Sequence, residues 1–310
     1  MNKQEAISIL KEHNQEHVIK RLEALEDDAA KKLISQVAMI DWKVVESIND
    51  KSDSSSEDKK IEPLEAVEIK DIKANKEKYT AKGVEAIKNG KVAAVLLAGG
   101  QGTRLGLDKP KGTLNVGVNK DLFLFGQLIR NLLDVVDMTG AYVPLYIMTS
   151  DKNNEDTVAF FEEHNYFGYD KDYVKFFIQS MVPSVDYNGK LYMESTDSLA
   201  MSPNGNGGWF LSLMAAGLDK DMEEKGVEYV NVFAVDNILQ RIADPAFIGA
   251  TMLAGAECGS KVVRKCEPEE KVGVMCRVNG HPSIIEYYEM SEELANLRRE
   301  DGELTYGFGV

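Results

Sequence analysis

The sequence contains few cysteines, and they follow no structural motif. Its 310 residues include three cysteines, Cys258, Cys266 and Cys276, without a CxxC pair. An odd number without that spacing suits neither a disulfide framework nor a zinc site. We therefore expect reduced thiols, with Cys258 and Cys276 in the core. His164 and His281 also lack metal-ligand spacing and a partner nucleophile, which favours a structural or exposed position for both.

Long apolar runs and an excess of positive charge are missing too. No stretch approaches the roughly 18 consecutive apolar residues of a membrane helix, and the first residues, "MNKQEAISILKEHNQEH", hold no apolar signal-peptide core. We therefore expect a cytoplasmic protein. The formal net charge of −15 argues against a nucleic-acid partner, because basic surfaces bind phosphate backbones. A small phosphorylated substrate is compatible with this charge, since a few local cations can act inside an acidic protein.

The chain begins with helical patterns. Val18, Leu22 and Leu25 recur at helical spacing within the first fifty residues. The polar run "NDKSDSSSEDKK" (49–60) is typical of a linker, and residues 62–90 carry a second helical pattern that stops at glycine. The sequence therefore predicts an N-terminal helical segment with its linker over residues 1–60 and a main domain over residues 61–310.

Strand and helix patterns alternate in the rest of the chain. Four apolar stretches, residues 91–99, 143–150, 173–179 and 227–236, are typical of strands buried on both faces, the last as a central strand. Helical patterns follow the first three of them, which predicts an α/β fold with a mostly parallel sheet flanked by helices. From Ser260 onward, shorter strand patterns with a turn at Asn279-Gly280 predict an antiparallel addition. The predicted helices cover residues 122–135, 153–168 and 209–226.

The first predicted strand ends in a glycine-rich loop, "LLAGGQGTRLG" (96–106), which "DKPKG" follows directly. In an open α/β sheet, ligands bind at the carboxyl ends of the strands. Glycines there let backbone N–H groups approach an anion, and Arg104 and Lys111 add cations suited to a polyphosphate. The alternatives are a tight turn without a ligand and two solvated surface charges.

Two common nucleotide-binding motifs are absent from this loop. The pattern GxxxxGK[ST] fails because Leu105 stands five residues after Gly100. The dinucleotide pattern GxGxxG fails at the same leucine, because Gly106 comes one residue late. A dinucleotide-dependent oxidoreductase is therefore disfavoured.

Several segments, in order along the chain, resemble the eukaryotic-type UDP-sugar pyrophosphorylase family. They are "LAGGQGTRLG…PKG", "FIQSMVPSVDYNGKLYMES…MSPNGNGGWFLSL", "VNVFAVDNILQRIADPAFIGATMLAGAECGSKVV" and "VGVMCRVNGHPSIIEYYEMS". They are most similar to the UDP-N-acetylhexosamine pyrophosphorylase branch, over roughly residue 91 to the end. The resemblance implies a Rossmann-like nucleotide-diphospho-sugar transferase sheet and makes residues 61–310 a nucleotidyltransferase domain. It also implies a reaction between UTP and a sugar 1-phosphate, N-acetylglucosamine 1-phosphate in that branch, which gives a UDP-sugar and pyrophosphate.

The resemblance also implies site residues. Gln179 would bind uracil, whose imide edge suits a carboxamide, and Asp236 would bind Mg²⁺, which prefers hard oxygen donors. Their alternatives are a polar strand end and a helix N-cap for "NILQRIA". For the loop 205–208, the alternative is a plain flexible loop. For the implied sugar ligands Glu286 and Tyr287, the alternative is the ordinary alternation of residues along a strand. The implied set is: catalytic, Arg104 and Lys111; nucleotide-binding, Leu97, Ala98, Gly99, Gly100, Gly102, Thr103, Lys111, Gln179 and Gly205; sugar-binding, Asn206, Glu286 and Tyr287; metal, Asp236.

Two departures from the family pattern bear on the substrate. The family carries an asparagine-containing "AGN" element where this chain has "YGFGV" (306–310), so glucose 1-phosphate is an alternative substrate. The family also has a further C-terminal part with another phosphate-binding lysine, which this sequence does not contain. A non-catalytic protein that binds nucleotide sugars is the rival class.

Overall fold

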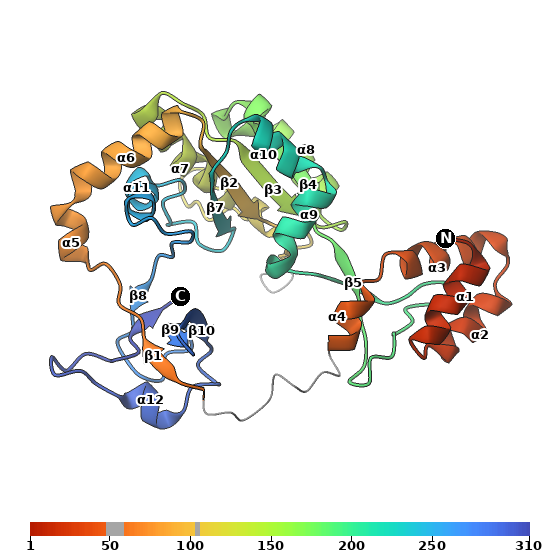
Figure 1. Cartoon of the computed structure of the whole chain (residues 1–310). Coiled ribbons are helices and arrows are strands. Elements are labelled where there is room, and N and C mark those ends of the chain that lie inside the picture. The colour runs from red at the N-terminus through yellow and green to blue at the C-terminus, as the bar shows by residue number, and fades with distance from the viewer. Residues whose placement is uncertain (48–58, 103–105) are drawn as a thin grey trace. The chain divides into compact units, whose positions relative to one another are not determined.

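The computed structural model describes residues 1–47, 59–102 and 106–310. The chain divides into two compact units, Met1–Asp53 with Ala86–Asp244, and Ser54–Glu85 with Pro245–Val310 (Figure 1). Nearly all of the predicted linker lies outside the described residues.

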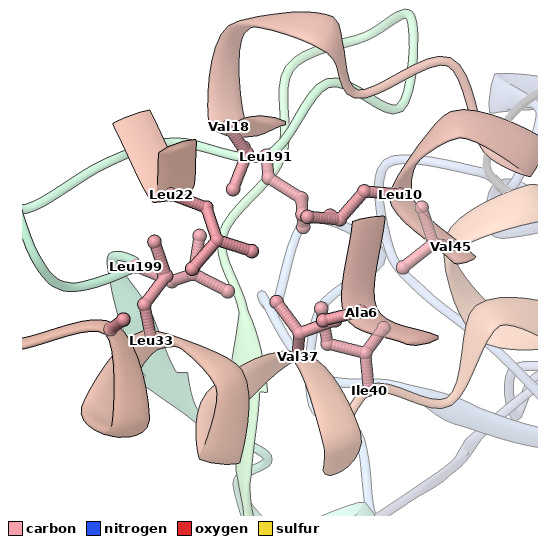
Figure 2. Close-up of a cluster of buried hydrophobic side chains, with 11 residues drawn as sticks. Ala6, Leu10, Val18, Leu22, Leu33, Val37, Ile40, Val45, Leu191 and Leu199 are labelled. Carbon is pink, nitrogen blue, oxygen red and sulfur yellow. The ribbon is translucent and has the colours of Figure 1, made fainter. Parts of the chain in front are cut away.

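The N-terminal segment is helical, as predicted. It contains α1 (Lys3–Glu12), α2 (Glu16–Ala24), α3 (Asp27–Ala38) and α4 (Trp42–Ser47). A capping box starts α1, because the Asn2 side chain accepts from the Glu5 N–H at 2.9 Å and the Glu5 carboxylate accepts from the Asn2 N–H at 2.8 Å. The apolar faces of these helices form one buried cluster, which also takes in Leu191 and Leu199 from a distant part of the sequence (Figure 2).

The first unit contains a four-stranded parallel sheet in the order β4-β3-β2-β7. Its strands are β2 (Val92–Leu97), β3 (Leu145–Thr149), β4 (Val174–Ile178) and β7 (Tyr229–Ala234), which confirms the four predicted strands and their parallel pairing. Both faces are buried. Val95, Tyr146 and Phe177 belong to a core cluster with residues of α9 (Trp209–Ala215) and α10 (Leu218–Glu224). Leu96 and Ile147, which point to the opposite face, are buried as well.

One strand position differs from the prediction. The strand expected to be central, β7, pairs only with β2 among the described strands and lies at the edge of the sheet. Val230 is accordingly 37% exposed. A continuous apolar pattern is typical of parallel strands, but it does not distinguish an edge strand from a central one.

Helices and short turns connect these strands. The predicted helices are α7 (Leu124–Thr139) and α8 (Asn154–Glu163), while residues 209–226 form two helices, α9 and α10, separated at Gly217. Between β4 and α9 the sequence did not predict the antiparallel pair β5 (Met181–Pro183) and β6 (Met201–Pro203). The 3-10 turns are η3 (Lys111–Thr113), η4 (Asn165–Gly168), η5 (Lys171–Tyr173) and η6 (Asn206–Gly208).

The second unit contains the predicted antiparallel addition. Strand β9 (Val274–Val278) pairs with β1 (Ile61–Pro63), β10 (His281–Ile285) and β11 (Phe308–Gly309), and β11 also pairs with β8 (Val263–Arg264). Asn279 and Gly280 make the β9–β10 turn with φ of 52° and 84°, the positive values that such a tight turn requires. The unit's helices are α5 (Ile69–Ala74), α6 (Lys76–Lys88, whose end belongs to the first unit), α11 (Pro245–Leu253) and α12 (Glu292–Asn296).

The remaining expectations concern cysteines and histidines. Cys276 is buried in β9 as expected, but Cys258 is exposed, because it lies in a loop after α11. His164 is structural, since its ring packs against Phe123, Phe160 and Phe167, and His281 is exposed. Over the described part of the chain, the helices are too short or too polar to cross a membrane.

Candidate active site

The candidate residues of the first unit follow three strands of the parallel sheet, β2, β4 and β7. The glycine loop follows β2, Gln179 directly follows β4, and Asp236 lies two residues beyond the end of β7. Because the strands are parallel, their carboxyl ends lie at one edge of the sheet, the usual place for a ligand in an open α/β fold. The loops therefore converge on one site.

The glycine loop presents free backbone donors at this edge. No described residue accepts a hydrogen bond from the N–H of Gly99 or Gly100. A Cβ built on Gly100 would meet nothing within 4 Å, so the space beside it is open. The loop closes at Gly102, whose N–H donates to the Lys109 carbonyl at 3.2 Å. These features suit an anion held by backbone N–H groups.

Not every predicted loop residue offers a free donor. The Ala98 N–H donates to the Met148 carbonyl at 2.8 Å, so Ala98 continues the sheet beyond β2. Leu97 is the last residue of β2, and its carbonyl accepts from the Val235 N–H at 3.3 Å. Thr103 and Arg104 lie outside the described residues.

Gln179 lies against the glycine loop. A Cβ on Gly99 would stand 2.4 Å from Gln179 Nε2, so a side chain at this position would displace the carboxamide. The Gln179 N–H donates to the Thr149 carbonyl at 2.8 Å, and the residue is only 4% exposed. No described residue hydrogen-bonds to its carboxamide. The carboxamide is therefore available to a ligand, which it can bind as both donor and acceptor.

Sequence reasoning missed Asn153, a fully buried residue that holds the glycine loop. Its Nδ2 donates to the carbonyls of Ala98 at 3.0 Å and Gly100 at 3.3 Å. Its Oδ1 accepts from the Ser150 N–H at 2.8 Å, which ties the loop after β2 to the turn after β3. The available signal was an asparagine three residues after the predicted buried strand 143–150, where a side-chain amide has unpaired backbone groups to bind.

Lys111 and Asp236 form an ion pair. Lys111 begins η3 after Pro110, and its side chain is 30% exposed, whereas that of Asp236 is 63% exposed. Asp236 caps no helix, because residues 235–244 form turns and α11 begins only at Pro245. The helix N-cap considered for this residue is therefore wrong, and its carboxylate faces solvent with a cation beside it.

A second asparagine, Asn131, holds the turn that follows Asp236. Its Nδ2 donates to the carbonyls of Ile238 at 3.2 Å and Gln240 at 3.0 Å. The Gln240 Nε2 donates in turn to the Ala234 carbonyl at 3.2 Å. Asn131 lies on α7 within an apolar helical stripe, where an amide was the only sequence signal of this role.

Gly205 and Asn206 lie between β6 and α9. Gly205 has φ 72° and ψ −163°, a backbone conformation open almost only to glycine. Asn206 is exposed at the start of η6. The backbone conformation at Gly205 is fixed by a specific turn, which disfavours a plain flexible loop.

Glu286 and Tyr287 belong to the second unit. Both lie in the turn after β10, so strand alternation does not account for them. Glu286 is half-buried, and Tyr287 is 44% exposed. In the segment aligned with the family's "AGN" element, Tyr306 is buried and its hydroxyl donates to the Ile61 carbonyl at 3.0 Å. That segment therefore helps to build the core of its own unit.

The family model of UTP–glucose-1-phosphate uridylyltransferase matches residues 42–302, and the chain belongs to this family. It is 45% identical over 238 residues to human UDP-N-acetylhexosamine pyrophosphorylase-like protein 1, covering 75% of this chain and 47% of the relative. It is 40% identical over 259 residues to UDP-N-acetylglucosamine pyrophosphorylase of Saccharomyces cerevisiae, covering 80% and 54%. The crystal structure of the Trypanosoma brucei uridine diphosphate N-acetylglucosamine pyrophosphorylase in complex with an inhibitor matches 100% of this chain and 65% of that one, with a TM-score of 0.84 and 29% identity. The chain thus spans about half the length of the curated relatives it matches.

A metal at this site would have few protein ligands. Across the described residues, no group of three or more His, Cys, Asp or Glu side chains is placed to hold a metal ion. Asp236 offers one exposed carboxylate. That fits Mg²⁺, which usually binds proteins through one or two carboxylates and takes its other ligands from phosphates and water.

Proposed function

We propose that the chain transfers uridylate from UTP to N-acetylglucosamine 1-phosphate, giving UDP-N-acetylglucosamine and pyrophosphate. The observation that carries the proposal is that the carboxamide of Gln179 and the neighbouring N–H groups of Gly99 and Gly100 have no hydrogen-bond partner among the described residues. The carboxamide suits the edge of uracil, and the backbone N–H groups suit a phosphate. The chain also belongs to a family named for uridylyl transfer.

The proposed roles divide the substrate among the loops. Gln179 binds the uracil imide, and the N–H groups of the glycine loop bind phosphate oxygens. Lys111 and Arg104 neutralise the triphosphate. The nucleotide-binding set further includes Leu97, Ala98, Gly99, Gly100, Gly102, Thr103 and Gly205, and the sugar-binding set is Asn206, Glu286 and Tyr287.

In the proposed reaction, an oxygen of the sugar phosphate attacks the α-phosphorus of UTP in line with the leaving group. One new P–O bond forms, and the bond from the α-phosphorus to the bridging oxygen breaks, with its electron pair leaving on pyrophosphate. The attacking oxygen is already anionic, so no side chain needs to remove a proton. The protein's contribution is position and charge neutralisation, the main source of catalysis in phosphoryl-type transfers.

Asp236 is the proposed residue for a divalent cation, specifically Mg²⁺. Such an ion, when bound, neutralises charge on the phosphates that it contacts. Asp236 would hold it through one carboxylate and would have to release Lys111 to do so. Lys111 would then be free to pair with phosphate.

The choice of N-acetylglucosamine over glucose is supported by the names of the yeast and trypanosome relatives. The burial of Tyr306 and Phe308 means that this segment's aromatic side chains are used in packing. We therefore assign sugar recognition to Asn206, Glu286 and Tyr287.

Pyrophosphate release from UTP by the full chain tests the proposal, with a panel of sugar 1-phosphates as second substrate. We expect release that requires both substrates and is fastest with N-acetylglucosamine 1-phosphate. Faster release with glucose 1-phosphate would make that sugar phosphate the assigned substrate and would leave uridylyl transfer as the proposed reaction. Binding of UTP without any release would instead favour a non-catalytic nucleotide-sugar-binding protein.

A further inference from the structure

The segment between Gln179 and Gly205, residues 180–204, forms an arm that leaves the edge of the sheet and returns to it. Its two ends pair with each other as β5 and β6, and the Asn204 N–H donates to the Ser180 carbonyl at 2.9 Å. One end of the arm directly follows the candidate uracil ligand, and the other directly precedes the candidate phosphate loop. The arm therefore connects two parts of the nucleotide site.

The far part of the arm is buried among the N-terminal helices. Leu191 and Leu199, each in a short hairpin of the arm, are both at most 2% exposed. Figure 2 shows them among side chains of α1, α2 and α3. The residues of the N-terminal segment in this cluster are Ala6, Leu10, Val18, Leu22, Ala30, Leu33, Val37, Ile40 and Val45.

A buried glutamine of the helical segment binds the first hairpin through its backbone. Gln15 is 1% exposed, its Nε2 donates to the Gly189 carbonyl at 2.8 Å, and its Oε1 accepts from the Leu191 N–H at 3.0 Å. A ring nitrogen of His17 lies 2.7 Å from the Leu191 carbonyl. The carboxamide thus makes the hydrogen bonds that a neighbouring strand would make. These bonds fix the register of the hairpin.

Gln36 repeats the arrangement at the second hairpin. Its Oε1 accepts from the Leu199 N–H at 2.9 Å, and its Nε2 lies 3.5 Å from the Leu199 carbonyl. Both glutamines therefore bind the main chain of the same residues whose side chains fill the helical cluster. Apolar packing alone tolerates sliding, whereas hydrogen bonds to the main chain set the register.

We propose that the N-terminal helices position the nucleotide site through this arm, with Gln15 and Gln36 as the positioning residues. The inference rests on the proposed function, in which Gln179 and Gly205 bind UTP. At the base of the arm, the Ser180 N–H donates to Ser212 Oγ at 2.8 Å, so the arm is also bonded to α9, the helix that follows Gly205. Helices α1 to α3 precede the residues matched by the family model.

Titration calorimetry with UTP on the full chain tests this role, at a temperature well below each variant's unfolding midpoint. The variants Gln15→Leu and Gln36→Leu keep the side-chain size and remove the hydrogen bonds. Displacement by about 1 Å can lower the rate at a positioned catalytic site about 100-fold. We expect each leucine variant to raise the Kd for UTP about 10-fold, at unchanged stoichiometry. Gln4→Leu, the same change at an exposed position on α1, should leave the Kd unchanged.

Gln36→Glu supplies a conservative rescue, because a carboxylate oxygen can still accept from the Leu199 N–H, which makes the shorter contact at 2.9 Å, and only the 3.5 Å contact of Nε2 with the Leu199 carbonyl is lost. We expect its Kd to stay within about 3-fold of the unaltered chain. Folded leucine variants with an unaltered Kd and a lower unfolding midpoint would overturn the inference, since the helices would then only stabilise the fold. If the unaltered chain binds no UTP, the proposed function itself fails, and the inference falls with it.

Discussion

Lys111 and Asp236 neutralise each other at the carboxyl edge of the parallel sheet. The sequence predicts different partners for them, a phosphate for the lysine and a metal ion for the aspartate. A phosphate is negative, as Asp236 is, and a metal ion is positive, as Lys111 is. The two predicted partners can therefore bind only if the ion pair separates. In the proposed reaction, this pair would separate when UTP and the metal ion bind.

Replacing Lys111 by alanine is expected to lower kcat much more than it weakens sugar binding. Its charge is most useful while negative charge develops on the leaving pyrophosphate, and loss of one such contact costs about 100-fold in related sites. Steady-state kinetics of pyrophosphate release measure this, with the KM for the sugar phosphate expected within about 3-fold. Lys120→Ala, an exposed lysine of the same unit, is the control. An unchanged kcat in Lys111→Ala would remove its assigned role.

Gly99→Ala and Gly100→Ala should differ in their effect on stability but both weaken UTP binding. A Cβ at Gly99 meets Gln179 Nε2 at 2.4 Å, whereas one at Gly100 meets nothing within 4 Å. The Gln179 carboxamide is the flexible end of its side chain and can shift, so Gly99→Ala should lower the midpoint of thermal unfolding only slightly, and Gly100→Ala should leave it unchanged. Both should weaken UTP binding, the second because its methyl enters the open space assigned to the nucleotide. Equal midpoints for the two variants would contradict the close approach of Gln179 to the loop.

These residues show where sequence reasoning succeeds and where it stops. The glycine loop and Asp236 are recognisable because strand ends carry local signals, namely an apolar run followed by glycine or carboxylate. The approach of Gln179 to Gly99 joins residues far apart in the sequence, and no local pattern encodes it. For the same reason the sequence predicts a helical stretch where β1 lies, since the partner strand β9 is about 200 residues away. The exposure of Cys258 likewise depends on where α11 ends, which composition does not determine.

Asn153→Asp should weaken UTP binding although the side chain keeps its shape. The change replaces the Nδ2 donor with a carboxylate oxygen facing the carbonyls of Ala98 and Gly100. A lost donor to a buried acceptor costs about 1–3 kcal/mol, and we expect the Kd for UTP to rise about 10-fold. Calorimetric titration provides the measurement.

The neighbouring variant Asn154→Asp is the matched control for that prediction. Asn154 uses its Oδ1 to accept from Thr149 Oγ1 at 2.7 Å, and aspartate retains such an acceptor. An acidic residue in the first turn of α8 is also favourable. Similar UTP affinities for the two aspartate variants would show that the amide donor of Asn153 does not hold the loop.

Asp221 should stabilise the fold of the sheet in a pH-dependent way. Burial alone would raise the pKa of Asp221, but hydrogen bonds from Lys175, Lys225 and Tyr146 outweigh it and hold that pKa below its ordinary value. The unfolded chain titrates near the ordinary value of about 3.9, so the stabilisation is complete above that pH and is lost as the pH falls through the lower folded pKa.

The test is the free energy of unfolding of Asp221→Asn from denaturant titrations. We expect a loss of about 1–3 kcal/mol that is constant between about pH 5 and 8 and becomes smaller toward pH 3. Glu223→Gln, on the exposed side of the same helix, should cost little. A loss that grows with acidity would contradict the sign of the pKa shift.

A crystal structure of the chain with bound UTP tests the central claim most directly. The account predicts uracil hydrogen-bonded to Gln179, phosphate oxygens on the N–H groups of Gly99 and Gly100, and Lys111 moved from Asp236 to the triphosphate. A triphosphate bound elsewhere, with the end of β2 empty and the Lys111–Asp236 pair intact, would contradict it.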